Sequence, residues 1–204
     1  MTVIIDYGVG NLFSLKSSFA AIGEEVTVTA DPKTIEKADR IILPGVGAFE
    51  DAARKLRESG LDVIIKKQAQ KGVPLMGICL GMQMLFDKSF EYGEHEGLSL
   101  IKGNIRPLTD IVDKTLKIPH IGWNALEFTK EHPLFKYIKE GDCVYFVHSY
   151  YASDCDDVIA NTEYSAPVTA AVAKDNVMGC QFHPEKSGEV GLAILKSFCE
   201  MGGR

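Results

Sequence analysis

Cys79 is the residue best suited to covalent chemistry, because it stands between Gly77 and Gly81 where a strand pattern changes to a helix pattern. Residues 73–78 form a short apolar run, and the apolar residues after Cys79 recur at helical spacing. Glycines on both sides remove side chains that would collide in so sharp a turn, so we expect Cys79 to be exposed and strained. A thiol at the first turn of a helix meets the positive end of the helix dipole, which favours the nucleophilic thiolate. The alternative is a small buried hydrophobic residue, as most free cysteines are.

A second glycine-bearing turn, Pro44-Gly45-Val46-Gly47, follows the strand predicted over residues 40–43. Open parallel sheets bind their ligands at the carboxyl ends of strands. The two glycines leave backbone N–H groups free to point outward, and in an acyl-transfer enzyme such groups stabilise the oxyanion that forms when a thiolate attacks a carbonyl. A plain strand-to-helix turn would use the same residues.

His183 and Glu185 are a candidate base and its orienting carboxylate. Pro184 prevents a helix through this point, and residues i and i+2 of an extended chain project to the same side. A cysteine nucleophile needs a histidine to take its proton and return it to the leaving amine, while a carboxylate fixes the tautomer of that histidine. Glu185 alone could equally mark a capped helix start. Together, Cys79, the glycine turn and this pair supply a nucleophile, oxyanion donors, a base and its orienting carboxylate, which are the separate roles of one acyl-transfer mechanism.

Alternating strand and helix patterns predict the framework that must position these residues. Strands are expected over residues 3–5, 25–29, 40–43 and 73–78, with helices over 12–20, 49–58 and 61–69 between them. Further along we expect a loop over 91–97, short strands over 101–107, 117–124 and 142–151, a hairpin over 168–183 and a helix over 188–201. This order predicts an α/β fold, a single domain over residues 1–204 with a mostly parallel open sheet flanked by helices and added short antiparallel strands.

Composition and charge exclude several function classes. The chain is 46% hydrophobic and 25% charged with a net charge of −6, which is ordinary globular usage. Without a lysine or arginine cluster we expect no binding to nucleic acid or to a membrane surface. Apolar runs are short and the chain starts with a strand-like segment, so we expect a cytoplasmic protein. Five cysteines without a Cys-x-x-Cys pair predict one reactive thiol and four structural ones, with no disulfide framework, no metal and no cofactor.

The segments Pro44–Gly47, Gly77–Gln83 and His183–Glu185 resemble the three signature blocks of the class I glutamine amidotransferases. Within that family, the chain is most similar to the glutaminase subunits of imidazole glycerol phosphate synthases, and the similarity runs from end to end. The segments that carry this finer resemblance are residues 6–12, 119–124, 147–150 and 186–187. The resemblance implies a flavodoxin-like class I glutaminase fold.

The resemblance also implies a reaction. Cys79 would attack the side-chain amide of glutamine to give a glutamyl thioester and ammonia, His183 and Glu185 would complete the triad, and water would release glutamate. The oxyanion hole would comprise the backbone N–H of Leu80 and one from Val46 or Gly47. Contacts with glutamine are implied for Gly45, Gly47, Gln83, Glu91, Ser149 and Tyr150.

A partner is implied as well, a (β/α)-barrel cyclase subunit that receives ammonia through a channel. In that family the cyclase makes imidazole glycerol phosphate and an aminoimidazole carboxamide ribotide in histidine biosynthesis. A closed path keeps ammonia neutral and nucleophilic, whereas water would convert most of it to ammonium. Such glutaminases are slow until the partner is present and liganded. The candidate interface residues are Tyr7, Asn11, Trp123, Tyr145 and Lys186, for each of which ordinary packing is the alternative.

Two other functions share part of this pattern. A free-standing γ-glutamyl hydrolase on the same scaffold would use Cys79 and His183, need no partner and accept glutamyl conjugates. A non-catalytic flavodoxin-like binding module would need none of the three blocks. A glutamine-analogue electrophile that labels Cys79 would exclude the module.

Overall fold

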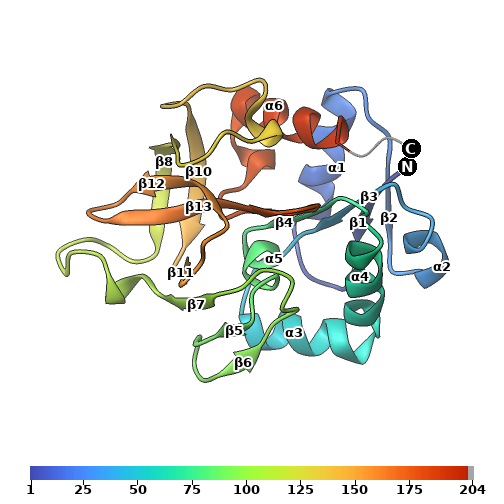
Figure 1. Ribbon diagram of the computed structural model, residues 1–204, viewed down its shortest axis with the longest axis horizontal. Helices are drawn as coiled ribbons and strands as arrows, with labels where there is room; N and C mark the ends of the chain where they lie inside the picture. Colours follow the sequence, from blue (N-terminus) through green and yellow to red (C-terminus); the bar gives the residue numbers. More distant parts are fainter. Residues whose placement is uncertain (202–204) are drawn as a thin grey trace.

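The computed structural model describes residues 1–201, which fold around an eight-stranded sheet of order β2-β1-β3-β4-β14-β13-β12-β9 (Figure 1). Its first five strands run parallel to their neighbours, and the last three extend it with antiparallel pairing. The strands are β1 (Thr2–Ile5), β2 (Val26–Thr29), β3 (Arg40–Leu43), β4 (Leu75–Ile78), β9 (Glu127–Phe128), β12 (Val158–Glu163), β13 (Pro167–Lys174) and β14 (Val177–Cys180). The predicted mostly parallel α/β sheet with antiparallel additions is therefore confirmed.

Helices cover both faces of the parallel part, and its inner strands β1 and β4 are accordingly buried along their whole length. Val3 and Ile5 of β1 pack in one core cluster with α3 and α4, while Ile4 faces the other cluster with α1 and α6 (Figure 1). The helices are α1 (Leu12–Ala21), α2 (Pro32–Ile35), α3 (Phe49–Glu58), α4 (Leu61–Gln70), α5 (Leu80–Gln83) and α6 (Gly188–Cys199), with 3-10 turns η1 (Leu108–Asp110), η2 (Pro133–Phe135) and η3 (Pro184–Lys186). None of the helices within residues 1–201 is long and apolar enough to cross a membrane.

Two smaller sheets lie beside the antiparallel edge and carry part of the site. One pairs β8 (His120–Ala125) with β10 (Cys143–His148) in antiparallel register. The other has the order β11-β7-β5-β6. Its strands are β5 (Lys88–Ser89), β6 (His95–Glu96), β7 (Asn104–Pro107) and β11 (Tyr150–Ser153). The chain passes directly from β10 to β11 at Ser149, so this connection links the two small sheets.

Most predicted elements are confirmed, and the bounds of β3 and α3 match the prediction. The helix expected after Cys79 is only one turn, and residues 91–97, expected as a loop, include strand β6. Helix α2 and strands β9 and β12 were not predicted. Helix α2 has only four residues, which is too short to show a helical period. Its N-cap is Asp31, whose side chain accepts from the backbone N–H groups of Lys33 and Thr34.

Candidate active site

Cys79 occupies a strained corner between β4 and α5. Its backbone has φ 54° and ψ −112°, an unusual conformation for a residue with a side chain, and its N–H donates to the Cys180 carbonyl at 2.8 Å. The predicted strain is confirmed, but the predicted exposure is wrong, since Cys79 is only 8% exposed. Strand β14 pairs along β4 and covers the corner, and that pairing joins residues about a hundred positions apart.

Three glycines allow the segments around Cys79 to touch. A Cβ on Gly81 would overlap the Leu43 carbonyl oxygen at the end of β3. A Cβ on Gly45 would lie 2.6 Å from the Gly81 nitrogen, and one on Gly77 would lie 2.5 Å from the Gly81 oxygen. No side chain fits at such separations, so glycine is required at all three positions. The consequence is that the Gly45–Gly47 turn packs directly against the helix that begins after Cys79.

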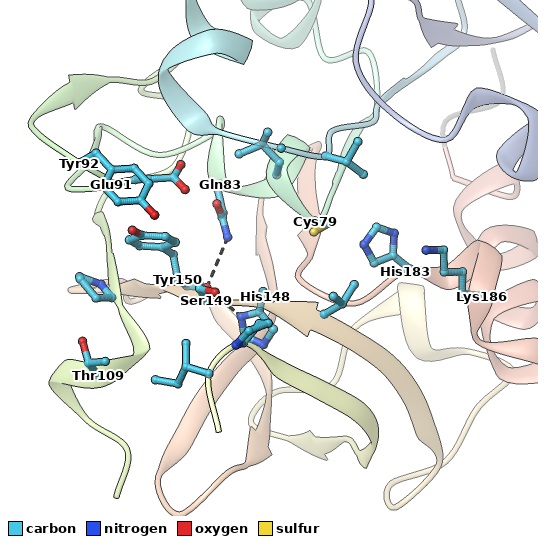
Figure 2. Close-up of a pocket in the computed structure, with 17 residues that line it drawn as sticks. Cys79, Gln83, Glu91, Tyr92, Thr109, His148, Ser149, Tyr150, His183 and Lys186 are labelled. Atoms are coloured by element: carbon cyan, nitrogen blue, oxygen red, sulfur yellow. Dashed lines mark hydrogen bonds between the residues drawn. The ribbon is translucent and has the colours of Figure 1, made fainter. Parts of the chain in front are cut away.

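His183 lies beside Cys79 (Figure 2), and the Glu185 carboxylate contacts the far side of its ring. His183 Nδ1 and Glu185 Oε1 are 2.8 Å apart, and both side chains are almost fully buried. Backbone bonds hold the histidine, because its N–H donates to the Tyr145 carbonyl and its carbonyl accepts from the Ser187 hydroxyl. Burial lowers the pKa of His183, but hydrogen bonds to Cys79 and Glu185 and their negative charge outweigh burial and raise the pKa to about 9. The ring is therefore charged at neutral pH.

Substituting Glu185 by glutamine is expected to weaken this charged pair. Loss of the negative charge lowers the pKa of His183, so at pH 8 the ring is more often neutral and a thiolate at Cys79 loses its charged partner. We expect iodoacetamide to modify Cys79 about twofold more slowly at pH 8, because lowering the pKa of His183 by about one unit from about 9 reduces the charged fraction of the ring from about 90% to about 50%. Mass spectrometry of the Cys79 peptide measures the rate.

The control for this variant is Glu189→Gln, the same change at an exposed position in the first turn of α6. Cys143 is exposed and gives an internal reference for thiol reactivity in the same sample. An unchanged pH profile of Cys79 alkylation in Glu185→Gln would contradict the assigned role of Glu185.

A cavity of about 570 Å³ opens in front of Cys79, a size suited to a small ligand (Figure 2). Among the residues selected from the sequence, ten line it: Val46, Gly47, Cys79, Leu80, Gln83, Glu91, Ser149, Tyr150, His183 and Lys186. Gly45 does not line it, and Glu185 lies behind His183. Leu80 is the first residue of α5, so its N–H has no acceptor within the helix and can serve a ligand.

Seven further residues line the cavity that the sequence analysis did not select: Tyr92, Pro107, Thr109, Ile118, Pro119, Val147 and His148. They come from β7, η1, β10 and the connecting loops, which contact the site only in the folded chain. His148 belonged to the predicted strand over residues 142–151, and its position just before Ser149 was the available signal.

Gln181 is another site residue that sequence reasoning missed. It is fully buried, and its Nε2 lies 3.7 Å from the Cys79 sulfur. Its Oε1 accepts from Gln83 Nε2 at 3.0 Å, and Gln83 Nε2 also lies 3.4 Å from the Tyr150 carbonyl. Since a carbonyl only accepts, this contact sets the orientation of both amides and directs an N–H of Gln181 at the sulfur. The available signal was its spacing, because Gln181 is two residues before His183 in an extended segment.

Glu91 has a structural role besides lining the cavity. Its Oε2 accepts from the backbone N–H of Phe49, the first residue of α3. A carboxylate at a helix N-terminus satisfies a free donor and favours the helix dipole. One carboxylate oxygen is therefore already bonded within the protein.

The five candidate interface residues divide into two groups. Tyr7 is buried, and its hydroxyl donates to the Pro44 carbonyl at 2.7 Å, so it supports the glycine turn from inside rather than forming an exposed contact. Asn11 caps α1 by accepting from the Ser14 N–H. The other three, Trp123, Tyr145 and Lys186, form a group beside the cavity.

Trp123, Tyr145 and Lys186 contact one another at the surface. Trp123 is 55% exposed and its ring meets that of Tyr145 edge-on at 6.0 Å. Lys186 Nζ lies 5.8 Å from the centre of the Tyr145 ring. Because Lys186 also lines the cavity, this group joins the candidate site to an exposed face of β8.

Within residues 1–201, no cluster of three or more histidine, cysteine, aspartate and glutamate side chains could hold a metal ion. Of the cysteines expected to be structural, Cys180 and Cys199 are buried, Cys155 is half-buried and Cys143 is exposed. The groups of the cavity that can take part in chemistry include a thiol, a charged histidine and backbone N–H donors.

Comparison with known proteins identifies relatives along the whole chain. The family model described as glutamine amidotransferase class-I matches residues 3–201. The chain is 52% identical to the imidazole glycerol phosphate synthase subunit HisH of Caldanaerobacter subterraneus subsp. tengcongensis, over 98% of both chains. It is also 52% identical to the protein of the same name from Sulfurimonas denitrificans, over 97% of both chains.

Solved structures share the fold at lower sequence identity. A crystal structure of a glutamine amidotransferase matches with a TM-score of 0.77 at 18% identity, over 99% of both chains. A chain in the structure of PurLQS from Thermotoga maritima matches with a TM-score of 0.75 at 22% identity, over 97% of this chain and 96% of that one.

Proposed function

The chain belongs to the class I glutamine amidotransferase family, and on that premise we propose that it is the glutaminase subunit of an imidazole glycerol phosphate synthase. Near-full-length relatives that bear the name of that subunit support the assignment. The observation that carries the chemistry is the buried His183–Glu185 pair beside Cys79 at the wall of one cavity. The proposed amidotransferase domain spans residues 1–204, and we place it in the cytoplasm.

The proposed reaction is hydrolysis of the glutamine side-chain amide. The Cys79 sulfur attacks the amide carbon, and the resulting oxyanion is stabilised by the Leu80 N–H together with one from Val46 or Gly47. His183 donates its proton to the leaving nitrogen, so the C–N bond breaks, ammonia leaves and a glutamyl thioester remains. His183 then takes a proton from water, whose oxygen attacks the thioester and releases glutamate and the thiolate. Glu185 holds the tautomer and supports the charged ring.

Glutamine is proposed to lie in the cavity along the wall formed by Gln83, Ser149 and Tyr150. Glu91 lines the same cavity and would meet the substrate with the carboxylate oxygen that does not accept from Phe49. Gly45 is proposed to act through packing, because it supports the neighbouring turn and does not line the cavity.

The proposed partner is a (β/α)-barrel cyclase subunit that receives the ammonia and makes imidazole glycerol phosphate and an aminoimidazole carboxamide ribotide. We assign its docking face to Trp123, Tyr145 and Lys186, with Asn11 at its edge. Exposed aromatic and cationic side chains beside the cavity support this choice, since such residues are enriched in interfaces.

Glutamate release tests the assignment. The chain alone should hydrolyse glutamine slowly, and addition of the cyclase with its nucleotide ligand should raise the rate at least about tenfold, which corresponds to a coupling of about 1.4 kcal/mol or more between sites. A rate that is high without the cyclase and unchanged by it would favour a free-standing γ-glutamyl hydrolase, which would also cleave glutamyl conjugates. Absence of glutamate under all conditions, with no adduct on Cys79, would favour a binding module.

A further inference from the structure

A series of polar contacts centred on two buried histidines runs from the wall of the cavity to strand β8. His148 Nδ1 lies 2.8 Å from the Tyr150 carbonyl oxygen, and His148 Nε2 lies 3.0 Å from His120 Nδ1. His120 Nε2 lies 2.8 Å from Asn124 Oδ1, and Asn124 Nδ2 donates to the Glu163 carbonyl at 3.1 Å. His120 is 1% exposed and His148 is 6% exposed, so water competes little for the contact between the two rings, whereas Asn124 is half-buried and its bond to Glu163 is exposed.

The number of protons shared among these four contacts decides how many of them can be hydrogen bonds. The four contacts join two backbone carbonyls, and each contact needs one proton between its heavy atoms. The Asn124 amide supplies one such proton in either orientation, and a neutral imidazole also supplies one. The amide and two neutral histidines therefore supply three protons for four contacts, whatever the tautomers. Two neutral rings must leave one contact between two lone pairs.

The separations of the four contacts fit a state with one additional proton. All four separations are of hydrogen-bond length. The His120 ring is stacked between Phe146, at 5.0 Å, and Tyr164, at 4.1 Å, and aromatic faces favour a charged ring.

Burial and nearby charge oppose the additional proton. Burial lowers the pKa of His120, and burial with the charges of His120 and His183 lowers the pKa of His148 to about 4. The Tyr164 ring faces His120, and its hydroxyl donates to the Lys117 carbonyl. In the described part of the chain, no carboxylate hydrogen-bonds to either histidine ring to offset the lowering of their pKa values. The additional proton should therefore leave at a lower pH than that of a free histidine.

We propose that His120 and His148 bind one shared proton and that this proton positions the Tyr150 segment of the cavity wall. Because Asn124 Nδ2 donates to the Glu163 carbonyl, the N–H groups of two neutral rings must point to the Tyr150 carbonyl and to Asn124 Oδ1, so the contact between the two rings is the one that opens when the proton leaves. His148 lines the cavity, so its movement changes the surface that a ligand meets. The positioning role rests on the proposed binding of glutamine, whereas the proton count does not.

Nuclear magnetic resonance of ¹⁵N-histidine in the whole chain tests the shared proton. In the wild type we expect His120 and His148 to take up one proton between them in a single step, at a pH below 6.5. Asn124→Asp places a carboxylate next to His120 and should move this step up by about one to three pH units. Two independent steps with a full proton on each ring, no step at either ring, or no shift in Asn124→Asp would overturn the proposal.

Two controls accompany this titration. Asn176→Asp makes the same change at a side chain that donates to the carbonyls of Ala69 and Val73, and it should leave the step unmoved. His132 hydrogen-bonds to the Leu134 N–H rather than to another histidine, so it should titrate as a single ring in every variant.

The positioning role has its own measurement. In the complex with the cyclase, the KM for glutamine should fall as the pair takes up its proton, while kcat at saturating glutamine follows other groups. In Asn124→Asp, the pH at which KM changes should rise by the same amount as the pH at which the histidine pair titrates in the magnetic resonance measurement. A KM that does not change at the pH where the histidine pair titrates would contradict the positioning role. If no variant releases glutamate, the proposed function fails, whereas the titration still decides the shared proton.

Discussion

Replacement of Cys79 by alanine is expected to abolish glutamate release and to leave the fold intact. Without the sulfur no thioester can form, and loss of the nucleophile from a comparable triad lowers kcat by a factor on the order of 10⁴ or more. Glutamate release should be measured in the complex with the cyclase and its nucleotide ligand, where the wild-type rate is highest. Alanine must adopt the same positive φ as cysteine, so the free energy of unfolding should change by less than about 2 kcal/mol.

The matched control is Cys143→Ala, the same substitution at an exposed cysteine of β10. It should retain the wild-type rate and the wild-type response to the cyclase. A Cys79→Ala variant that keeps more than about a tenth of wild-type activity would mean that another group starts the reaction, and the proposed mechanism would then be wrong.

Gly81→Ala is expected to cause a large loss of stability through a single added methyl group. The added Cβ would overlap the Leu43 carbonyl oxygen. Because the nearest atoms belong to the backbone of Leu43 and Pro44, no side chain can move aside, and β3 and α5 would have to separate. Overpacking of this kind costs on the order of 3 kcal/mol or more in the free energy of unfolding. Urea unfolding measures the loss, and any protein that remains folded should release little glutamate because the Gly45–Gly47 turn has moved away from Cys79.

Gly72→Ala separates this collision from the ordinary cost of replacing glycine. Gly72 has φ +83° and open space around its Cα, so alanine there meets only backbone strain of about 1 kcal/mol. If Gly81→Ala were as stable as Gly72→Ala, the close packing of β3 against α5 would not be what requires glycine at position 81.

The sequence by itself determined the local features that chemistry requires. Helix α3 was predicted with its observed bounds, because apolar period and end signals depend on near neighbours only. The corner at Cys79 was predicted from its flanking glycines for the same reason. The contact of His183 with Glu185 was also predicted, since an extended segment places residues i and i+2 on one side.

Only the tertiary structure decided how deeply these residues lie and what else contacts them. Cys79 is buried because β14 pairs with β4, and Tyr7 is buried beneath the glycine turn. The bond from Gln181 to the Cys79 sulfur spans 102 positions, and the pairing of His120 with His148 depends on the register of β8 against β10. Burial and side-chain contact are set by which distant segments pack together, and local periodicity carries no information about that choice.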